Sequence, residues 1–332
     1  MSDRKIKWGI LSTAKIGTVK VIPGLQKSDL CEVIAISSRA AGKAQAAAEK
    51  LGLRKAYDSY DALLRDPEIE AIYNPLPNHL HVPWTKKAIE AGKHVLCEKP
   101  VALDADEAKS LLNVLHKNSE VKVMEAFMYR FHPQWIKAKE LVKSGEIGEV
   151  KTLQSFFSYF NDDPRNIRNM PDIGGGGLMD IGCYCISFGR FIFDAEPHRV
   201  VGLMEYDPGL RVDRLASGIL DFTGGKSSTF TCSTQLMPFQ RCVIFGTDGY
   251  IEIEIPVNAP PDQPTRLWLV TKSGRKEIEF EICDQYTAQG TAFAKAIIED
   301  SEVPTPLIDA VNNMRVIDAV VESARANEWI VI

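Results

Sequence analysis

The sequence predicts an α/β domain with a doubly wound parallel sheet, followed by an α+β domain with a large, open, mostly antiparallel sheet. The length of 332 residues fits about two domains at roughly 150 residues each. Short apolar strands alternate with helices in the first third, which is typical of βαβ units. After about residue 125, strand-like segments dominate, and several alternate polar and apolar residues as a sheet with one packed face does. We therefore expect domains at 1–124 and 125–332.

The first domain is expected to contain five short apolar strands with a helix after each of the first four. The strands cover residues 5–11, 32–36, 71–73, 94–97 and 122–124. The helical patterns cover residues 15–27, 40–52, 82–91 and 105–117. Gly52 is expected to be the C-cap of the second helix, and Asp104 the N-cap of the fourth.

The second domain is expected to begin with a helix at 134–144 and to end with two helices, at 286–300 and 308–325. Eight strands are expected between them: 152–159, 199–206, 216–222, 227–233, 241–245, 249–255, 266–271 and 276–282. Turn signals such as Ser273-Gly274 separate these strands. A helix at 178–193 interrupts this region.

Composition and charge exclude several classes of protein. Hydrophobic residues make up 45% and charged residues 25%, which is enough apolar mass for a buried core. A formal net charge of −5 argues against nucleic-acid binding driven by bulk charge. No apolar run is long enough for a signal peptide or a membrane span. Seven scattered cysteines without a CxxC pair favour a reducing compartment, so we expect a cytoplasmic protein.

The loop after the first strand has the spacing of a phosphate-binding loop. Dinucleotide-binding folds carry a GxGxxG fingerprint there, and this sequence keeps the spacing as Ser12-x-Ala14-x-x-Gly17. Small residues allow the backbone to approach a pyrophosphate, and the helix that follows offers free N–H groups. Since two of the three glycines are replaced, the loop alone is equally consistent with a tight turn in any α/β protein. The residues expected to contact a cofactor here are Ser12, Thr13, Ala14 and Ile16.

The end of the second strand indicates which dinucleotide binds. A NAD site usually has an Asp or Glu there to accept the ribose 2′-hydroxyl. This sequence has Ser37-Ser38-Arg39, and no acid before Glu49. Arg39 can stack on adenine and pair with a 2′-phosphate, Ser38 can donate to that phosphate, and Lys43 follows one helical turn later. The alternative is that these residues form only the solvent-exposed, basic start of a helix. Their position after a strand, with a small-residue loop upstream, favours an NADP site.

Glu98-Lys99-Pro100 directly follows the fourth expected strand. Ligands of open α/β sheets bind at the carboxyl ends of the strands. Because a residue before proline avoids the helical conformation, Lys99 is expected in an extended loop that faces the cleft. In isolation such a triplet is usually a surface turn.

Four segments together resemble the glucose–fructose oxidoreductase/inositol dehydrogenase/rhizopine-catabolism (Gfo/Idh/MocA) family. Residues 91–100 (AGKHVLCEKP) resemble its signature, and residues 73–81 (YNPLPNHLH) resemble its nicotinamide-side loop. Residues 175–184 (GGGLMDIGCY) resemble its second catalytic motif, and residues 125–133 (EAFMYRFHP) the segment that leads into its second domain. The resemblance covers essentially the whole chain. It implies a Rossmann domain followed by a substrate-binding and dimerisation domain.

The resemblance implies that Lys99, Asp180 and Tyr184 line the reacting centre, and the residues themselves support this. Asp180 and Tyr184 are spaced i, i+4, so they share one face of a helix. The helix around them is apolar on nearly every side, which indicates burial. A buried carboxylate needs a partner, and Lys99 would supply one. The alternative is a core tyrosine and an acid in the first turn of a helix.

Tyr184 indicates the branch of the family. The inositol dehydrogenase branch has His at this position, whereas Tyr resembles the branch with glucose–fructose oxidoreductase, dimeric dihydrodiol dehydrogenase and NADP-dependent xylose dehydrogenase. A free tyrosine has a pKa of about 10 and is a poor base at neutral pH unless a nearby cation lowers that pKa. Whether Tyr184, Lys99 or a relay of both carries the proton stays open.

Further residues are candidates for contacts with the substrate or the cofactor. Arg130, Tyr159 and Arg168 could bond substrate hydroxyls, although each is also plausible at a surface or domain contact. No His/Asp/Glu cluster has the spacing of metal ligands, so no metal is expected. The cofactor side is completed, by resemblance, by Leu76, Pro77, Asn78, His81, Glu98 and Lys99.

These observations predict an NADP(H)-dependent oxidoreductase that transfers a hydride between the nicotinamide and a CH–OH or C=O group of a sugar, polyol or cyclic diol. Two alternatives stay open: a non-catalytic NADP-binding regulator of the same fold, and a sugar–sugar oxidoreductase that holds NADP tightly. The partner expected is a small carbohydrate or diol, with no nucleic acid and no membrane. By resemblance, the open sheet face is expected to form a homodimer or a dimer of dimers.

Overall fold

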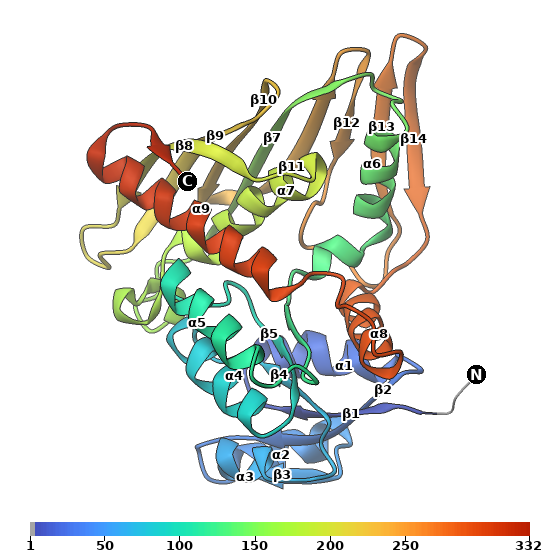
Figure 1. Cartoon of the computed structure of the whole chain (residues 1–332), viewed down its shortest axis with the longest axis vertical. Coiled ribbons are helices and arrows are strands. Elements are labelled where there is room, and N and C mark those ends of the chain that lie inside the picture. Colours follow the sequence, from blue (N-terminus) through green and yellow to red (C-terminus); the bar gives the residue numbers. More distant parts are fainter. Residues whose placement is uncertain (1–3) are drawn as a thin grey trace. The chain divides into compact units, whose positions relative to one another are not determined.

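The computed structural model describes residues 4–332, and the chain divides by its contacts into two compact units (Figure 1). The first unit comprises the chain up to Met128 together with Asp284–Val311. The second unit comprises Tyr129–Cys283 and Asn312–Ile332. Residues 284–311 thus belong to the first unit, whereas the expected domain boundaries assigned them to the second.

The first unit is built on a six-stranded, all-parallel sheet, as expected for a doubly wound fold. The strand order is β3-β2-β1-β4-β5-β6, with neighbours on both sides of β1. The strands are β1 (Ile6–Ile10), β2 (Cys31–Ser37), β3 (Lys55–Tyr57), β4 (Ala71–Asn74), β5 (His94–Cys97) and β6 (Val123–Glu125).

Helices connect these parallel strands. They are the π-helical turn Gly17–Val21, α1 (Ile22–Gln26), α2 (Lys43–Leu51), α3 (Tyr60–Leu64), the 3₁₀ turn Asn78–Leu80, α4 (His81–Glu90) and α5 (Ala105–Leu115). Asp104 caps α5 as expected, because its carboxylate accepts the N–H of Glu107 at 2.7 Å. Gly52 ends α2 in a left-handed conformation, also as expected.

Helix α8 (Gln285–Ile298) joins the first unit because it packs closely on α1 and β1. A Cβ atom on Gly24 of α1 would lie 2.8 Å from the Cβ of Tyr286, and one on Gly290 would lie 2.1 Å from Leu25. Glycine on both helices therefore allows their backbones to approach. On the sheet, the ring of Trp8 contacts Phe293 with 5.7 Å between ring centroids. Nothing in the local sequence marks this helix as part of the dinucleotide-type unit.

The second unit is built on a nine-stranded mixed sheet in the order β14-β13-β12-β11-β7-β10-β9-β8-β15. All neighbours are antiparallel except β7 and β10, which pair in parallel. The strands are β7 (Val150–Phe160), β8 (Pro197–Tyr206), β9 (Asp213–Phe222), β10 (Lys226–Ser233), β11 (Gln235–Gly246), β12 (Gly249–Ile253), β13 (Thr265–Thr271), β14 (Gly274–Phe280) and β15 (Ile330–Val331).

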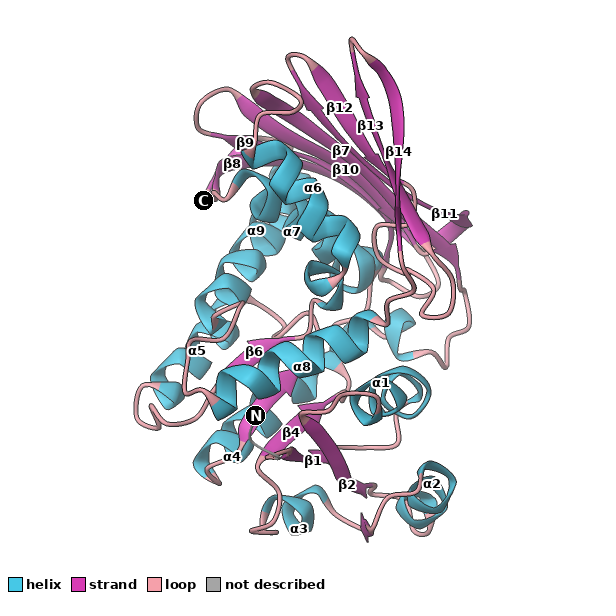
Figure 2. Ribbon diagram, turned by 90° about the vertical axis from the view of Figure 1, so that its right-hand side faces the viewer, coloured by secondary structure: helices cyan, strands magenta, loops and turns pink. Residues whose placement is uncertain are grey.

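Helices α6 (Pro133–Lys143), α7 (Cys183–Phe193) and α9 (Leu307–Ala326) lie against one face of this sheet (Figure 2). The other face carries large exposed side chains, among them Leu203 and Ile219. Across residues 4–332, no helix combines the length and the apolar character that a membrane span requires.

The predicted fold class is confirmed, with three short elements added. Strand β3, helix α3 and strand β15, which have three, five and two residues, were not predicted from the sequence. Such short segments carry too few residues for a hydrophobic period to be recognised. The parallel pairing of β7 with β10 was also not predicted, because strand direction depends on the path of the intervening chain.

An aromatic cluster joins α6 to α7 in the core of the second unit. Trp135 of α6 is fully buried, and its ring stacks on Phe188 of α7 with 4.5 Å between centroids. Tyr129 contacts both rings edge-on. The indole N–H of Trp135 donates to the carbonyl of Pro256 at 2.7 Å. The cluster holds α7 in place, and α7 carries Tyr184.

We expect Trp135→Ala to lower the free energy of unfolding by about 3–5 kcal/mol, because it leaves a large cavity and an unpaired carbonyl. The matched control is Trp329→Ala in the same unit, where the ring is 40% exposed and contacts the guanidinium of Arg199. That variant should lose about 1 kcal/mol or less. Urea unfolding followed by circular dichroism measures both, and equal losses would contradict the assigned core.

Candidate active site

Four loops of the first unit lie at the carboxyl edge of its parallel sheet. They follow β1, β2, β4 and β5, and the residues that the sequence predicted for cofactor binding lie in these loops or at the first residues of the helices that follow them. Strands β1 and β4 are neighbours in the sheet. The strand order continues from β1 towards β3 on one side and from β4 towards β6 on the other, so the direction of winding reverses between them. Ligands of open α/β sheets bind outside the strand ends at this switch point.

The loop after β1 takes a conformation that suits an anion at its N–H groups. Ser12 has a φ of 67°, a left-handed value usual for glycine, so it stands in for the first missing glycine of the fingerprint. Its hydroxyl accepts the N–H of Ala14 at 3.2 Å. The helix that begins near Ile16 has no side-chain N-cap, and Thr13 and Ile16 are half-buried beside it. The side chain of the N-cap residue therefore does not accept any of the first N–H groups of this helix.

The loop after β2 holds Arg39 over a buried aromatic ring. The guanidinium lies 5.8 Å from the ring centroid of Tyr60, which is 4% exposed and contacts Trp84 edge-on. No carboxylate among residues 4–332 forms an ion pair with Arg39, which is exposed. Ser38 is buried and accepts the N–H of Ala40.

Helix α2 begins at Lys43, immediately after this loop. Its N-cap is Gly42, with a φ of 73° and no side chain to offer. The first turn of α2 contains no acidic residue. Ser38, Arg39 and Lys43 thus lie at a helix start that has positive charge and no side-chain cap.

His81 ties the loop after β4 to the loop that carries Lys99. Its ring is buried, with Nδ1 2.7 Å from the carbonyl oxygen of Pro100 and Nε2 2.6 Å from that of Leu76. Burial lowers the pKa of His81 to about 4. The two carbonyl oxygens favour the protonated ring and oppose this shift, but burial has the larger effect. His81 was expected at the nicotinamide side by resemblance, and in the structure its ring lies between the loop after β4 and the loop that carries Lys99. Pro77 and Asn78 lie between Leu76 and His81 in the same loop.

Glu98 fixes the backbone just before Lys99. Its carboxylate accepts the hydroxyl of Tyr73 at 2.6 Å and the N–H of Lys99 at 3.3 Å. The N–H of Glu98 donates to the carbonyl of Asn74 at 3.0 Å. The end of β5 is therefore tied to the end of β4, and Lys99 starts from a defined backbone position.

In the second unit, Asp180 is held from two sides. Its Oδ1 lies 3.0 Å from Nε of Arg168, and its Oδ2 accepts the hydroxyl of Tyr159 at 2.6 Å. Burial and the nearby Asp180 carboxylate raise the pKa of Tyr159. The structure thus brings together three residues that the sequence predicted separately. Tyr159 and Arg168 were expected to bond substrate, whereas here they also orient the Asp180 carboxylate.

Tyr184 follows Asp180 on the same helical segment. Residues Leu178–Gly182 form a π-helical turn that continues into α7, so the segment departs from the regular α-helix that the sequence suggested. π-turns of this kind occur frequently at functional sites. The ring of Tyr184 is 5% exposed and has edge contacts with Tyr129 and Phe157, at centroid distances of 6.0 and 6.2 Å.

Arg130 was expected to bond substrate or to lie at a surface or domain contact, and the structure shows that its side chain is buried. It is 8% exposed, donates to the hydroxyls of Ser187 and Tyr129, and lies over the ring of Phe191. These contacts place the guanidinium in the core beside α7. The sequence could not distinguish this from a substrate contact, because a buried arginine has no local signature.

Sequence reasoning missed Asp213, the first residue of β9. It is 5% exposed, and its Oδ2 accepts the N–H of Leu178 at 2.6 Å. Burial raises the pKa of Asp213 to about 6, while N–H donors from the start of the 178–193 helix oppose the shift. No signal in the sequence links Asp213 to the glycine-rich segment at 174–177. Tyr60 was missed too, because it lies in the unpredicted helix α3.

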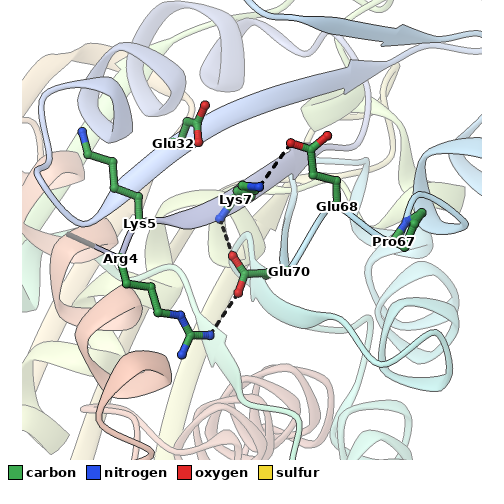
Figure 3. Close-up of a pocket in the computed structure, with 7 residues that line it drawn as sticks. All are labelled: Arg4, Lys5, Lys7, Glu32, Pro67, Glu68 and Glu70. Carbon is green, nitrogen blue, oxygen red and sulfur yellow. Dashed lines mark hydrogen bonds and ion pairs between the residues drawn. The ribbon is translucent and has the colours of Figure 1, made fainter. Parts of the chain in front are cut away.

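An open pocket of about 580 Å³ lies at the amino-terminal edge of the first unit's sheet (Figure 3). Arg4 and Lys7 pair there with Glu70 and Glu68, at 3.0 and 3.2 Å. This edge is opposite the one that carries the four loops, and its charges compensate one another. We therefore do not assign it to the active site. Among residues 4–332, no group of three or more His, Cys, Asp or Glu side chains could hold a metal ion.

Comparison with known proteins identifies the family. Residues 6–127 match the model described as an oxidoreductase family with an NAD-binding Rossmann fold, and residues 135–252 match the GFO/IDH/MocA C-terminal domain. D-xylose 1-dehydrogenase (NADP(+)) 2 of Haloferax volcanii is 41% identical over 322 residues, which are 96% of this chain and 97% of that protein. Trans-1,2-dihydrobenzene-1,2-diol dehydrogenase of Xenopus tropicalis is 32% identical over 281 residues, or 83% of this chain and 81% of that protein.

A solved structure shows the same architecture. A 3-ketoreductase from Actinomadura kijaniata, in complex with NADP and TDP-benzene, matches with a TM-score of 0.90 at 26% identity. The match covers 96% of this chain and 98% of that one. The family and the branch inferred from the motifs are thereby confirmed. The protein is an oxidoreductase of the Gfo/Idh/MocA family, with a Rossmann sheet in its first unit and the family's C-terminal sheet in its second.

Proposed function

We propose that this protein is an NADP(H)-dependent oxidoreductase that acts on a CH–OH or C=O group of a sugar, polyol or cyclic diol. One combination of features carries the proposal. Arg39, in the loop after β2, has no acidic partner among residues 4–332, and in the same chain Arg168 holds the carboxylate of Asp180 on the π-turn that leads into Tyr184. The names of the relatives, a xylose dehydrogenase that uses NADP and a dihydrodiol dehydrogenase, support the same cofactor and class of substrate.

The residues at the carboxyl edge of the first unit fit NADP. Arg39 is an exposed cation with no acidic partner in the described part of the chain, and it lies just after the strand end where a NAD site would have an acid. Ser38, Arg39 and Lys43 would hold the 2′-phosphate, and the loop at 12–16 would hold the pyrophosphate. When bound, NADP supplies the hydride acceptor or, when reduced, the hydride donor.

The residues of the chain supply the proton chemistry and the orientation of the substrate. Tyr184, assisted by Lys99, takes the hydroxyl proton during oxidation and returns it during reduction. Asp180, whose carboxylate is held by Arg168 and Tyr159, would orient a substrate hydroxyl. The buried position of the Tyr184 ring keeps water away from this proton.

We expect Lys99→Ala and Tyr184→Phe each to lower kcat by about 10²–10⁴-fold at saturating NADP(H), because each removes a group that moves the proton. Turnover is followed by nicotinamide absorbance in a screen of aldoses, deoxysugars, ketosugars and diols, in both directions. Lys109→Ala and Tyr250→Phe are the matched controls, since both positions lie outside the candidate site. Unchanged kcat in both site variants would overturn the catalytic assignment.

We expect Arg39→Asp to weaken NADP binding by about 10–100-fold, because the 2′-phosphate loses a charge-assisted partner and meets a like charge. Binding of NAD should change little. Arg315→Asp makes the same change of net charge on an exposed helix position and serves as the control. Isothermal titration with each dinucleotide measures the effect. Equal affinity of the unmodified protein for NADP and NAD would contradict the 2′-phosphate site.

A further inference from the structure

Asp213 is a buried carboxylate whose contacts are backbone N–H groups. It lies at the start of β9 and is 5% exposed. Its Oδ2 accepts the N–H of Leu178 at 2.6 Å, and the N–H of Gly177 also donates to it. Among residues 4–332, no lysine or arginine forms an ion pair with it. A buried anion without a cation partner has to be stabilised by such donors.

The donors belong to the start of the helical segment that carries Asp180 and Tyr184. The N-cap of this segment is Gly177, which has no side chain to cap the first N–H groups. Asp213 supplies the missing cap from 35 residues away in the chain. A carboxylate at this end also interacts favourably with the helix dipole.

The glycine run before the helix is shaped around this carboxylate. Gly176 has a φ of 120°, and a Cβ atom there would lie 2.0 Å from Oδ1 of Asp213. A side chain at this position would therefore displace the carboxylate as well as strain the backbone. Both the positive φ of residue 176 and its close approach to the Asp213 carboxylate thus require glycine at this position.

The same run contacts the turn that carries Arg168. The N–H of Gly176 donates to the carbonyl of Arg168 at 2.8 Å, and a Cβ atom on Gly175 would lie 2.6 Å from that carbonyl oxygen. Arg168 in turn holds Asp180 at 3.0 Å. Asp213, the glycine run, Arg168 and Asp180 form one connected set within the second unit.

We propose that Asp213 is a positioning residue: its carboxylate fixes the first turn of the 178–193 helix and, through it, the orientation of Asp180 and Arg168 toward the substrate. The effect that we expect on kcat/KM rests on the proposed oxidoreductase function, whereas the role of Asp213 as the cap of the helix does not depend on that function. Asp213 acts through other residues and is not itself assigned a contact with substrate or cofactor.

Asp213→Asn tests the proposal, because the amide keeps one acceptor oxygen but removes the charge and adds donors where acceptors are needed. Amide hydrogen exchange by mass spectrometry should become about 10-fold faster in peptides that cover 164–170 and 176–182. Peptides from the first unit should be unchanged. Asp221→Asn on the same strand is the control, since Asp221 pairs with Arg199 near the surface.

Kinetics separate positioning from general loss of stability. Asp213→Asn should lower kcat/KM for the substrate by about 10-fold or more while the Kd for NADP stays unchanged. Gly176→Ala, which keeps the carboxylate but displaces it, should cause the same pattern. A variant that only destabilised the fold would instead lower the fraction of active protein, leaving KM unchanged.

Two results would overturn the proposal. One is hydrogen exchange in Asp213→Asn that equals that of the unmodified protein in both peptides. The other is faster exchange together with unchanged kcat/KM, which would show a cap without a role in positioning. If the unmodified protein shows no activity in the substrate screen, the proposed function fails, and the exchange at 164–170 and 176–182 alone decides whether Asp213 positions Arg168 and Asp180.

Discussion

Backbone N–H groups at the start of a helix need acceptors, and this requirement organises both units of the protein. Several helices meet it with the side chain of their own N-cap residue: Ser59, Asp104, His132 and Asp284. The helices that follow β1 and β2 have no such side chain, and they begin at the edge where a dinucleotide's phosphates would bind. The helix that carries Asp180 and Tyr184 also lacks one, and Asp213 supplies its cap from another strand. These three helix starts, which have no cap from their own N-cap residue, coincide with proposed functional positions.

Buried polar contacts then hold the reactive side chains at defined places. Glu98 and His81 tie the segment around Lys99 to the end of β4, and Arg168 and Tyr159 hold the carboxylate of Asp180. Each contact joins loops or elements that are separate in the sequence, so a change in one loop alters the backbone of another. Such support is what a proton-transfer site requires, since small displacements of an acid or base cost a large part of its catalytic effect.

The sequence located the strand ends and helix starts well, because apolar periodicity and small-residue loops are local signals. It also indicated which residue types lie at those ends: Ser38 and Arg39 after β2, and Lys99 after β5. It did not show that the guanidinium of Arg130 is buried against Ser187 and Phe191. It expected Lys99 as the partner of Asp180 and did not foresee that Arg168 and Tyr159 hold this carboxylate. In each case the missing information was a contact between distant segments.

The two-domain fold class, the parallel first sheet and the identity of the motif residues follow from the sequence alone, since they depend on the order and period of residues along the chain. Only the tertiary structure decided that α8 packs with the first unit, through Gly24 and Gly290. Only it paired β7 with β10 in parallel and placed Asp213 at the start of the helix that carries Asp180. These contacts join residues tens to hundreds of positions apart, and their energy depends on close approach in space. No local pattern of residue types records such an approach.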